Sequence, residues 1–270
     1  MTETKNSISE SDLLVPFEIQ NIPREYKEYY LAKRQNFFAS VQGFSETFDC
    51  YMLLDKIWLR EFQDLKVASD LNRMFPLLLY FNAHAKIRVS IELALSGCLA
   101  EARSILRDAI EFVAHAHHML SDPALQMKWL SKNDQEKAFK EAFEKNKKAG
   151  LFNELDELHK AWGDLSETGS HATINAVCDR FAMVEDGKTF EWQMRYLGIE
   201  PRMWGMQLLW MLLVCFTMEQ TLFLDYENRL QLDDTLLKMR AEFENRKEQL
   251  RRDLIVRYEV PPPVARGVSP

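Results

Sequence analysis

Residues 72–120 read NRMFPLLLYFNAHAKIRVSIELALSGCLAEARSILRDAIEFVAHAHHML, and this stretch decides the fold class. Two long segments with helical apolar spacing, Asn72 to Leu95 and Leu99 to Leu120, flank Ser96-Gly97. Glycine adopts the left-handed conformation that ends many helices without the steric cost that other residues carry. The stretch therefore predicts two helices that fold back on each other as an antiparallel hairpin.

The rest of the chain contains few residues that break helices. Its 270 residues include 9 Gly and 9 Pro, and the hydrophobic fraction of 47% with 28% charged residues is that of an ordinary globular protein. We therefore predict an all-α protein, an up-and-down bundle of about six to eight helices. One strand signal stands apart: residues 181–196, in which Asp186-Gly187 predicts the turn of a small β-hairpin.

The composition changes at both ends predict the domain organisation. Residues 1–20 are polar without periodicity and are expected to form a loose arm. Residues 21–258 are expected to form a single helical domain whose last helix covers about 232–258. Residues 259–270 contain the Pro-rich stretch Val260-Pro-Pro-Pro-Val, which cannot continue a helix and is predicted to be disordered.

The most apolar run, residues 203–218, reads MWGMQLLWMLLVCFTM. It is shorter than the roughly 20 residues of a membrane-spanning helix. We therefore predict a buried central helix without stable membrane insertion, with a membrane span as the alternative. The N-terminal sequence lacks the apolar core of a signal peptide, and the four cysteines form no CxxC pair. These features predict a cytoplasmic protein with reduced thiols.

Two apolar stripes predict packing faces. The first helix after Pro23 carries an aromatic stripe expected to face the core, namely Tyr26, Tyr29, Tyr30, Phe37 and Phe38. The last helix carries a short coiled-coil-like seam, namely Leu232, Leu236, Met239, Phe243 and Leu250. This seam predicts either a homodimer through the C-terminal helix or a fold-back onto the core of the same chain.

Residues 133–149 are rich in oppositely charged side chains four residues apart, such as Glu136 with Lys140 and Glu144 with Lys148. Pairs at this spacing lie on one face of a helix. We predict a solvated surface helix here and assign it no function.

The helix at 99–120 carries the main candidate for chemistry. Five polar residues fall within about 80° of one another around its axis: Ser104, Arg107, Glu111, His115 and His118. An arginine can bind phosphate through two hydrogen bonds, and a histidine or glutamate can act as a general base. The alternative is a solvated helix face with a routine Arg107–Glu111 pair. The spacing of Glu111, His115 and His118 would allow a metal, but no metal motif accompanies it, so we predict neither a metal nor a cofactor.

A second candidate is the segment 163–173, GDLSETGSHAT, in which Ser166, Ser170 and His171 lie close to Gly169. Loops of this composition often position side chains for binding. Helix capping by the hydroxyl groups is the alternative.

Two motifs carry a family resemblance. The glycine turn leads into Gly97-Cys-Leu-Ala-Glu-Ala-Arg-Ser-Ile-Leu-Arg107-Asp-Ala-Ile-Glu111, and a later helix ends in Leu165-Ser-Glu-Thr-Gly-Ser-His171. Over about residues 70–225 the chain resembles a group of uncharacterised bacterial helical proteins related to the HEPN superfamily (higher eukaryotes and prokaryotes nucleotide-binding domain). In that group the recurring polar positions correspond here to Arg107, Glu111 and His171.

The resemblance implies a protein of bacterial defence or stress response that engages RNA or nucleotide phosphates, with a metal-independent ribonuclease as the implied enzyme class. Arg107, Glu111 and His171 are then the candidate catalytic residues, and Ser104, His115, His118, Ser166 and Ser170 the candidate binding residues. The superfamily's catalytic motif has a His five residues after an Arg, whereas Phe112 follows Arg107 at that spacing. Whether the chain is an enzyme stays open. The alternative is a noncatalytic helical interaction or dimerisation module.

Overall fold

The computed structural model describes residues 23–65, 71–145, 147–148, 150–170, 181–185, 190–194 and 201–258. Its long helices are α1 (Arg24–Gly43), α2 (Ser45–Leu65), α3 (Leu71–Leu95), α4 (Leu99–Ser121), α9 (Pro201–Tyr226) and α10 (Asp234–Arg257). The shorter helices are α5 (Ala124–Leu130), α6 (Glu136–Phe139) and α7 (Asp156–Leu165), with π-helical turns η3 (Lys140–Glu144) and η4 (Ser166–Ser170) and the 3-10 turn η5 (Glu227–Arg229). The predicted all-α helical bundle is confirmed. The predicted arm at 1–20 and tail at 259–270 lie outside the described residues.

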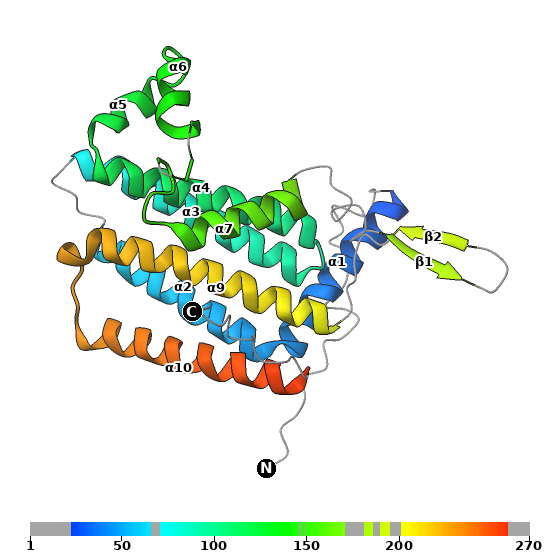
Figure 1. The fold of residues 1–270 in the computed structure, drawn as a ribbon. Coiled ribbons are helices and arrows are strands. Elements are labelled where there is room, and N and C mark those ends of the chain that lie inside the picture. The colour runs from blue at the N-terminus through cyan, green and yellow to red at the C-terminus, as the bar shows by residue number, and fades with distance from the viewer. Residues whose placement is uncertain are drawn as a thin grey trace, which may run out of the picture.

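Two short strands accompany the helices. Strand β1 (Phe181–Glu185) pairs with β2 (Phe190–Met194) in antiparallel register, with Phe181 opposite Met194. Figure 1 shows the pair apart from the helical bundle, close to one end of α1. The predicted turn at Asp186-Gly187 lies outside the described residues, so the complete hairpin stays a prediction.

The α3–α4 hairpin is the element that the sequence predicted most directly. Gly97 has a φ of 85°, the left-handed conformation expected for it. The N–H of Cys98 donates to the carbonyl of Leu93 at 2.8 Å, which satisfies a carbonyl at the end of α3. The Ser90 hydroxyl then ties the two helices together by donating to the carbonyl of Ala102 at 2.7 Å. The antiparallel hairpin is therefore confirmed.

Helix α9 forms the centre of the bundle. Figure 1 shows it between α10 on one side and α4 with α7 on the other. By length and composition alone, Arg202–Arg229 is the one helical stretch among the described residues that could cross a membrane, yet 61% of its most apolar window is buried inside the protein. Leu208, Leu212 and Cys215 are fully buried. The prediction of a buried core helix is confirmed.

Helix α10 folds back onto its own chain. Its Leu236, Phe243 and Leu250 are buried, and the Phe216 ring of α9 packs on Phe243 with 4.9 Å between ring centroids. Figure 1 shows α10 on the outside of the layer formed by α2 and α9. The core of the predicted seam thus packs within the chain, which is the second of the two predicted outcomes.

A buried ionic network fastens α10 in place. Arg240 donates to Glu61 of α2 at 2.7 Å and also to Glu219 of α9. Both carboxylates are fully buried, and burial together with their mutual repulsion raises the pKa of Glu61. Sequence reasoning missed this network because the three residues are far apart in the chain.

Helix α1 corrects the predicted aromatic stripe. Phe37 packs against the core, but Tyr26, Tyr30 and Phe38 are exposed, so the core-facing stripe is wrong for most of its length. Helix α1 runs directly into α2 at Phe44, so its C-terminal half is held close to the bundle. The stripe identifies an apolar face but does not reveal how far the bundle extends along it.

Candidate functional site

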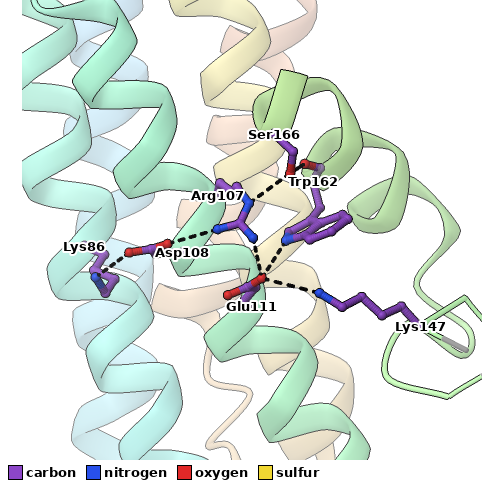
Figure 2. Close-up of polar contacts among 7 residues, drawn as sticks. All are labelled: Lys86, Arg107, Asp108, Glu111, Lys147, Trp162 and Ser166. Atoms are coloured by element: carbon purple, nitrogen blue, oxygen red, sulfur yellow. Dashed lines mark hydrogen bonds and ion pairs between the residues drawn. The ribbon is translucent and has the colours of Figure 1, made fainter. Parts of the chain in front are cut away.

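Arg107 joins α4 to α7 and is the centre of the candidate site. Its Nε donates to the Ser166 hydroxyl at 2.9 Å, and its Nη2 donates to the Glu111 carboxylate one turn further along α4 at 2.8 Å. Its Nη1 also lies 3.4 Å from the carboxylate of Asp108. Figure 2 shows the guanidinium between these partners. The Arg107–Glu111 pair therefore exists as its spacing predicts, but it faces another helix instead of open solvent.

Trp162 of α7 forms the platform of this site. Its indole Nε1 donates to the Glu111 carboxylate at 2.9 Å, and the Arg107 guanidinium carbon lies 5.0 Å from its ring centroid. The Lys147 ammonium lies 4.2 Å from the same ring and 3.9 Å from the Glu111 carboxylate. Cations at these distances are attracted to the electron-rich face of an indole. Trp162 therefore holds two cations and one carboxylate in a fixed arrangement, which Figure 2 shows.

Ser166 orients the guanidinium from the start of η4. Its buried hydroxyl donates to the carbonyl of Trp162 at 2.7 Å and accepts the hydrogen bond from Arg107. The hydroxyl proton is thus used within the helix, so the oxygen can only accept from the arginine. Of the sequence-predicted residues, the structure brings Arg107, Glu111 and Ser166 together.

The charge of the cluster is positive. Lys86 of α3 donates to Asp108 at 3.1 Å, which extends the network across the α3–α4 hairpin (Figure 2). Three cations, namely Arg107, Lys147 and Lys86, therefore face two carboxylates, namely Glu111 and Asp108. The cluster carries a net charge of +1 within a chain whose formal net charge is −7. This local positive charge favours an anionic group over a cationic one.

The two predicted histidines of the α4 stripe belong to a different environment. His115 stacks on Phe143 with 4.9 Å between ring centroids, and His118 meets the same ring edge to face at 5.7 Å. Burial, with the positive charge of neighbouring residues, lowers the pKa of His115 to about 4. His115 is therefore neutral near pH 7 and packs as an aromatic ring. Burial also lowers the pKa of His118.

This packing also corrects the predicted surface helix at 133–149. The segment is a short α6 followed by the π-helical turn η3, and its Phe139 and Phe143 are buried against His115. The charged residues indicated a solvated helix, but the two phenylalanines four residues apart form an apolar face.

The remaining predicted residues are Ser104, Ser170 and His171. Ser104 lies half-buried on α4, one turn before Arg107. Ser170 ends η4, and His171 lies outside the described residues. The described residues hold no group of three His, Cys, Asp or Glu side chains that could bind a metal ion.

Sequence reasoning missed Trp162, Lys147, Asp108 and Lys86. A signal existed for Trp162, because it precedes Ser166 by four residues and so lies on the same helix face. Lys147 belonged to the charge run to which no function was assigned. Lys147 contacts Glu111 and Trp162 only because the segment between η3 and α7 that carries it folds against α4.

Comparisons with known proteins add no family assignment. No family model matches the chain, and no curated protein or solved structure matches it significantly. The fold and the site geometry therefore define an all-α bundle with a cationic, tryptophan-backed cluster between α4 and α7.

Proposed function

We propose that the chain is a HEPN-like helical protein of bacterial defence or stress response, acting in the cytoplasm. It binds a phosphate group of RNA or of a nucleotide at the Arg107 cluster. The observation that carries this proposal is the fixed guanidinium: Glu111, Ser166 and Trp162 hold Arg107 in one orientation. A guanidinium held in place loses little conformational entropy when it binds a planar or tetrahedral oxyanion.

The donors of Arg107 support this role. A guanidinium carries five N–H groups, and one each on Nε, Nη1 and Nη2 goes to Ser166, Asp108 and Glu111. Among the described residues, the second N–H on each Nη atom has no hydrogen-bond partner, so these two groups are the proposed donors to phosphate oxygens. Lys147 adds a second positive charge beside the same tryptophan ring.

If the site is catalytic, the reaction class is metal-independent ribonuclease cleavage. Glu111 and His171 are then the residues that would move protons, because His115 is buried against Phe139 and Phe143 and burial lowers its pKa to about 4. Glu111 already accepts from Arg107 and Trp162, so its first role is to hold the arginine.

The test is a binding titration with Arg107→Ala. We expect wild type to bind a fluorescein-labelled single-stranded RNA or a fluorescent ATP analogue at low salt, measured by anisotropy. Arg107→Ala should weaken this binding at least about tenfold, since a charge-assisted contact to an ionised group contributes roughly 1.5–3 kcal/mol. Arg251→Ala, an exposed arginine on α10, is the matched control and should bind as wild type does.

Two results separate the outcomes. If wild type binds neither probe, phosphate binding is rejected. If Arg107→Ala mainly lowers the melting temperature and leaves the affinity unchanged, the arginine is a tether between α4 and α7 and the proposal also fails. RNA cleavage in the presence of a metal chelator, slowed about 100-fold by Arg107→Ala or His171→Ala, would establish the enzyme.

A noncatalytic interaction module is the second candidate, favoured by exposed leucines at the α9–α10 turn. Leu224, Leu232 and Leu237 are exposed there, although the core of the α10 seam is buried. They would form the contact of a homodimer through the C-terminal helix. Light scattering tests this: Leu224→Glu with Leu237→Glu should convert a dimer to a monomer, whereas Leu130→Glu, at an equally apolar exposed site on α5, should not. A wild-type monomer rejects it.

A further inference from the structure

The Arg107 cluster is only partly open to solvent. The Arg107 side chain is 19% exposed, those of Glu111 and Lys147 are each 29% exposed, and Ser166 is buried. An internal phosphodiester of RNA has a nucleoside on both sides, and both must fit around a partly buried guanidinium. A terminal phosphate extends beyond the last sugar and has a nucleoside on one side only. The limited exposure therefore favours a phosphate at the end of a strand or on a mononucleotide.

Arg107 and Lys147 lie close enough to contact one phosphate group together. Arg107 Nη2 lies 2.8 Å and Lys147 Nζ 3.9 Å from the same atom, Oε1 of Glu111. The two nitrogens are therefore separated by no more than the sum of these distances, in the arrangement that Figure 2 shows. A phosphate group that accepts a charge-assisted hydrogen bond of about 2.8 Å on each side spans such a separation.

The number of donors matches a phosphomonoester. The second N–H on each Nη atom of Arg107 has no hydrogen-bond partner among the described residues, and the Lys147 ammonium adds a third donor. A phosphomonoester presents three terminal oxygens, whereas an internal phosphodiester presents two. Two guanidinium N–H groups and one ammonium can therefore each pair with a separate oxygen of a monoester.

The charges of the cluster favour the same ligand. Arg107, Lys147 and Lys86 face Glu111 and Asp108, so these five groups carry an excess of one positive charge. A phosphomonoester carries a charge of about −1.5 to −2 at pH 7, and a phosphodiester carries a single negative charge. The Coulomb energy with a given excess charge is proportional to the charge of the ligand. Glu111 and Asp108 also repel the monoester more strongly, and the excess of one charge already includes both.

We propose that the Arg107 cluster binds a terminal phosphomonoester, at the end of an RNA strand or on a mononucleotide, in preference to an internal phosphodiester. This inference rests on the proposed phosphate binding at Arg107 and adds which kind of phosphate is bound. Arg107 supplies two of the donors and Lys147 the third. Glu111 and Ser166 hold the guanidinium in position.

The first test compares single-stranded RNA probes of one sequence that carry a 5′-monophosphate, a 3′-monophosphate or no terminal phosphate. Each probe has an internal fluorescein label, and binding to the full chain is measured by anisotropy at low salt. At least one phosphorylated strand should bind about tenfold more tightly than the strand without a terminal phosphate, the effect of added charge-assisted contacts. The strand that gains affinity identifies the chain end.

The second test separates a mononucleotide from a strand end. Adenosine 5′-monophosphate and its methyl ester, a diester of nearly the same size, compete for the site against the fluorescent ATP analogue. The monophosphate should compete about tenfold more strongly than the methyl ester. This preference without any difference among the three RNA strands would identify a mononucleotide as the ligand.

A pair of variants locates the third donor. Lys147→Ala should reduce the preference for the terminal phosphate to about twofold or less, whereas Lys148→Ala, at the exposed neighbouring position, should keep it. An unchanged preference in Lys147→Ala, or equal losses in the two variants, would overturn the shared contact with Arg107.

The outcomes also separate this inference from the proposed function. Equal affinities for all three strands and equal competition by monophosphate and methyl ester, with binding still weakened by Arg107→Ala, would overturn the preference and leave phosphate binding intact. If wild type binds none of the probes, both are rejected.

Discussion

Arg107 and Arg240 both lie against an aromatic ring and are equally exposed, but the carboxylates that pair with them differ in burial. Each lies against an aromatic ring, Trp162 at 5.0 Å and Phe223 at 3.8 Å, and each side chain is 19% exposed. Their carboxylate partners differ: Glu111 is 29% exposed and Asp108 40%, whereas Glu61 is 0% and Glu219 1% exposed. The exposure of the arginines is therefore the same at the two sites, and the exposure of the carboxylate partners is what distinguishes them.

The difference follows from the balance of charge. Around Arg240, one cation faces two buried carboxylates, and burial with their mutual repulsion raises the pKa of Glu61, so this network has no excess of positive charge. Around Arg107, three cations, namely Arg107, Lys86 and Lys147, face two partly solvated carboxylates, so these five groups carry an excess of one positive charge. The network around Arg240 links α2, α9 and α10, whereas the cluster around Arg107 has an excess of positive charge.

The largest effect is expected for Arg240→Met. It leaves the Glu61–Glu219 pair buried without its cation, which typically costs about 3–5 kcal/mol of unfolding free energy. Urea denaturation followed by circular dichroism measures it. Arg246→Met, which breaks an exposed pair with Glu242 on the same helix, should change stability by less than about 0.5 kcal/mol.

A combined variant sharpens this result. Adding Glu61→Gln and Glu219→Gln to Arg240→Met removes both buried carboxyl groups and should recover most of the lost stability. A loss of less than about 1 kcal/mol in Arg240→Met alone would contradict the structural role of the network.

A smaller, pH-dependent effect is expected for Glu61→Gln. Burial, with repulsion from Glu219, raises the pKa of Glu61 in the folded protein above the ordinary value of 4.5. Above pH 4.5 the folded state therefore binds more protons than the unfolded state, so this group's contribution to stability falls as pH rises toward the folded pKa. The slope is at most about 1.4 kcal/mol per pH unit.

Glu61→Gln removes this titration, so its stability relative to wild type should rise between pH 5 and pH 8. Urea denaturation of both proteins across this range measures the difference, in which other titrating groups largely cancel. A constant difference would mean that Glu61 is ionised in the folded protein.

The smallest effect on stability is expected for Lys147→Ala. Its ammonium lies 3.9 Å from Glu111 and is partly solvated, so its loss should change the unfolding free energy by less than about 1 kcal/mol. Phosphate affinity should nevertheless fall about threefold to tenfold and depend less on salt. The exposed neighbour Lys148→Ala is the control for the anisotropy titration. Equal changes in both variants would argue for a diffuse charge effect.

The local structure was largely predictable because it depends on neighbours in the chain. Gly97 ends α3 through its backbone freedom, and the periodic apolar residues of α3 and α4 define both helices. The Arg107–Glu111 pair follows from a spacing of one helical turn. The sequence did not predict that the polar residues on one face of α4 lie in two different environments. His115 stacks on Phe143, whereas the Arg107 guanidinium lies against the Trp162 ring.

The sequence by itself determined the all-α class, the α3–α4 hairpin and the buried apolar helix, because helical periodicity and chain breakers act over a few residues. The tertiary structure alone decided which charges meet. Glu61, Glu219 and Arg240 lie on three helices, and Lys147 reaches Trp162 only after the loop before α7 folds back. Packing brought these distant groups together, and burial then raised the pKa of Glu61, whereas Glu111 and Asp108 stay partly solvated beside Arg107.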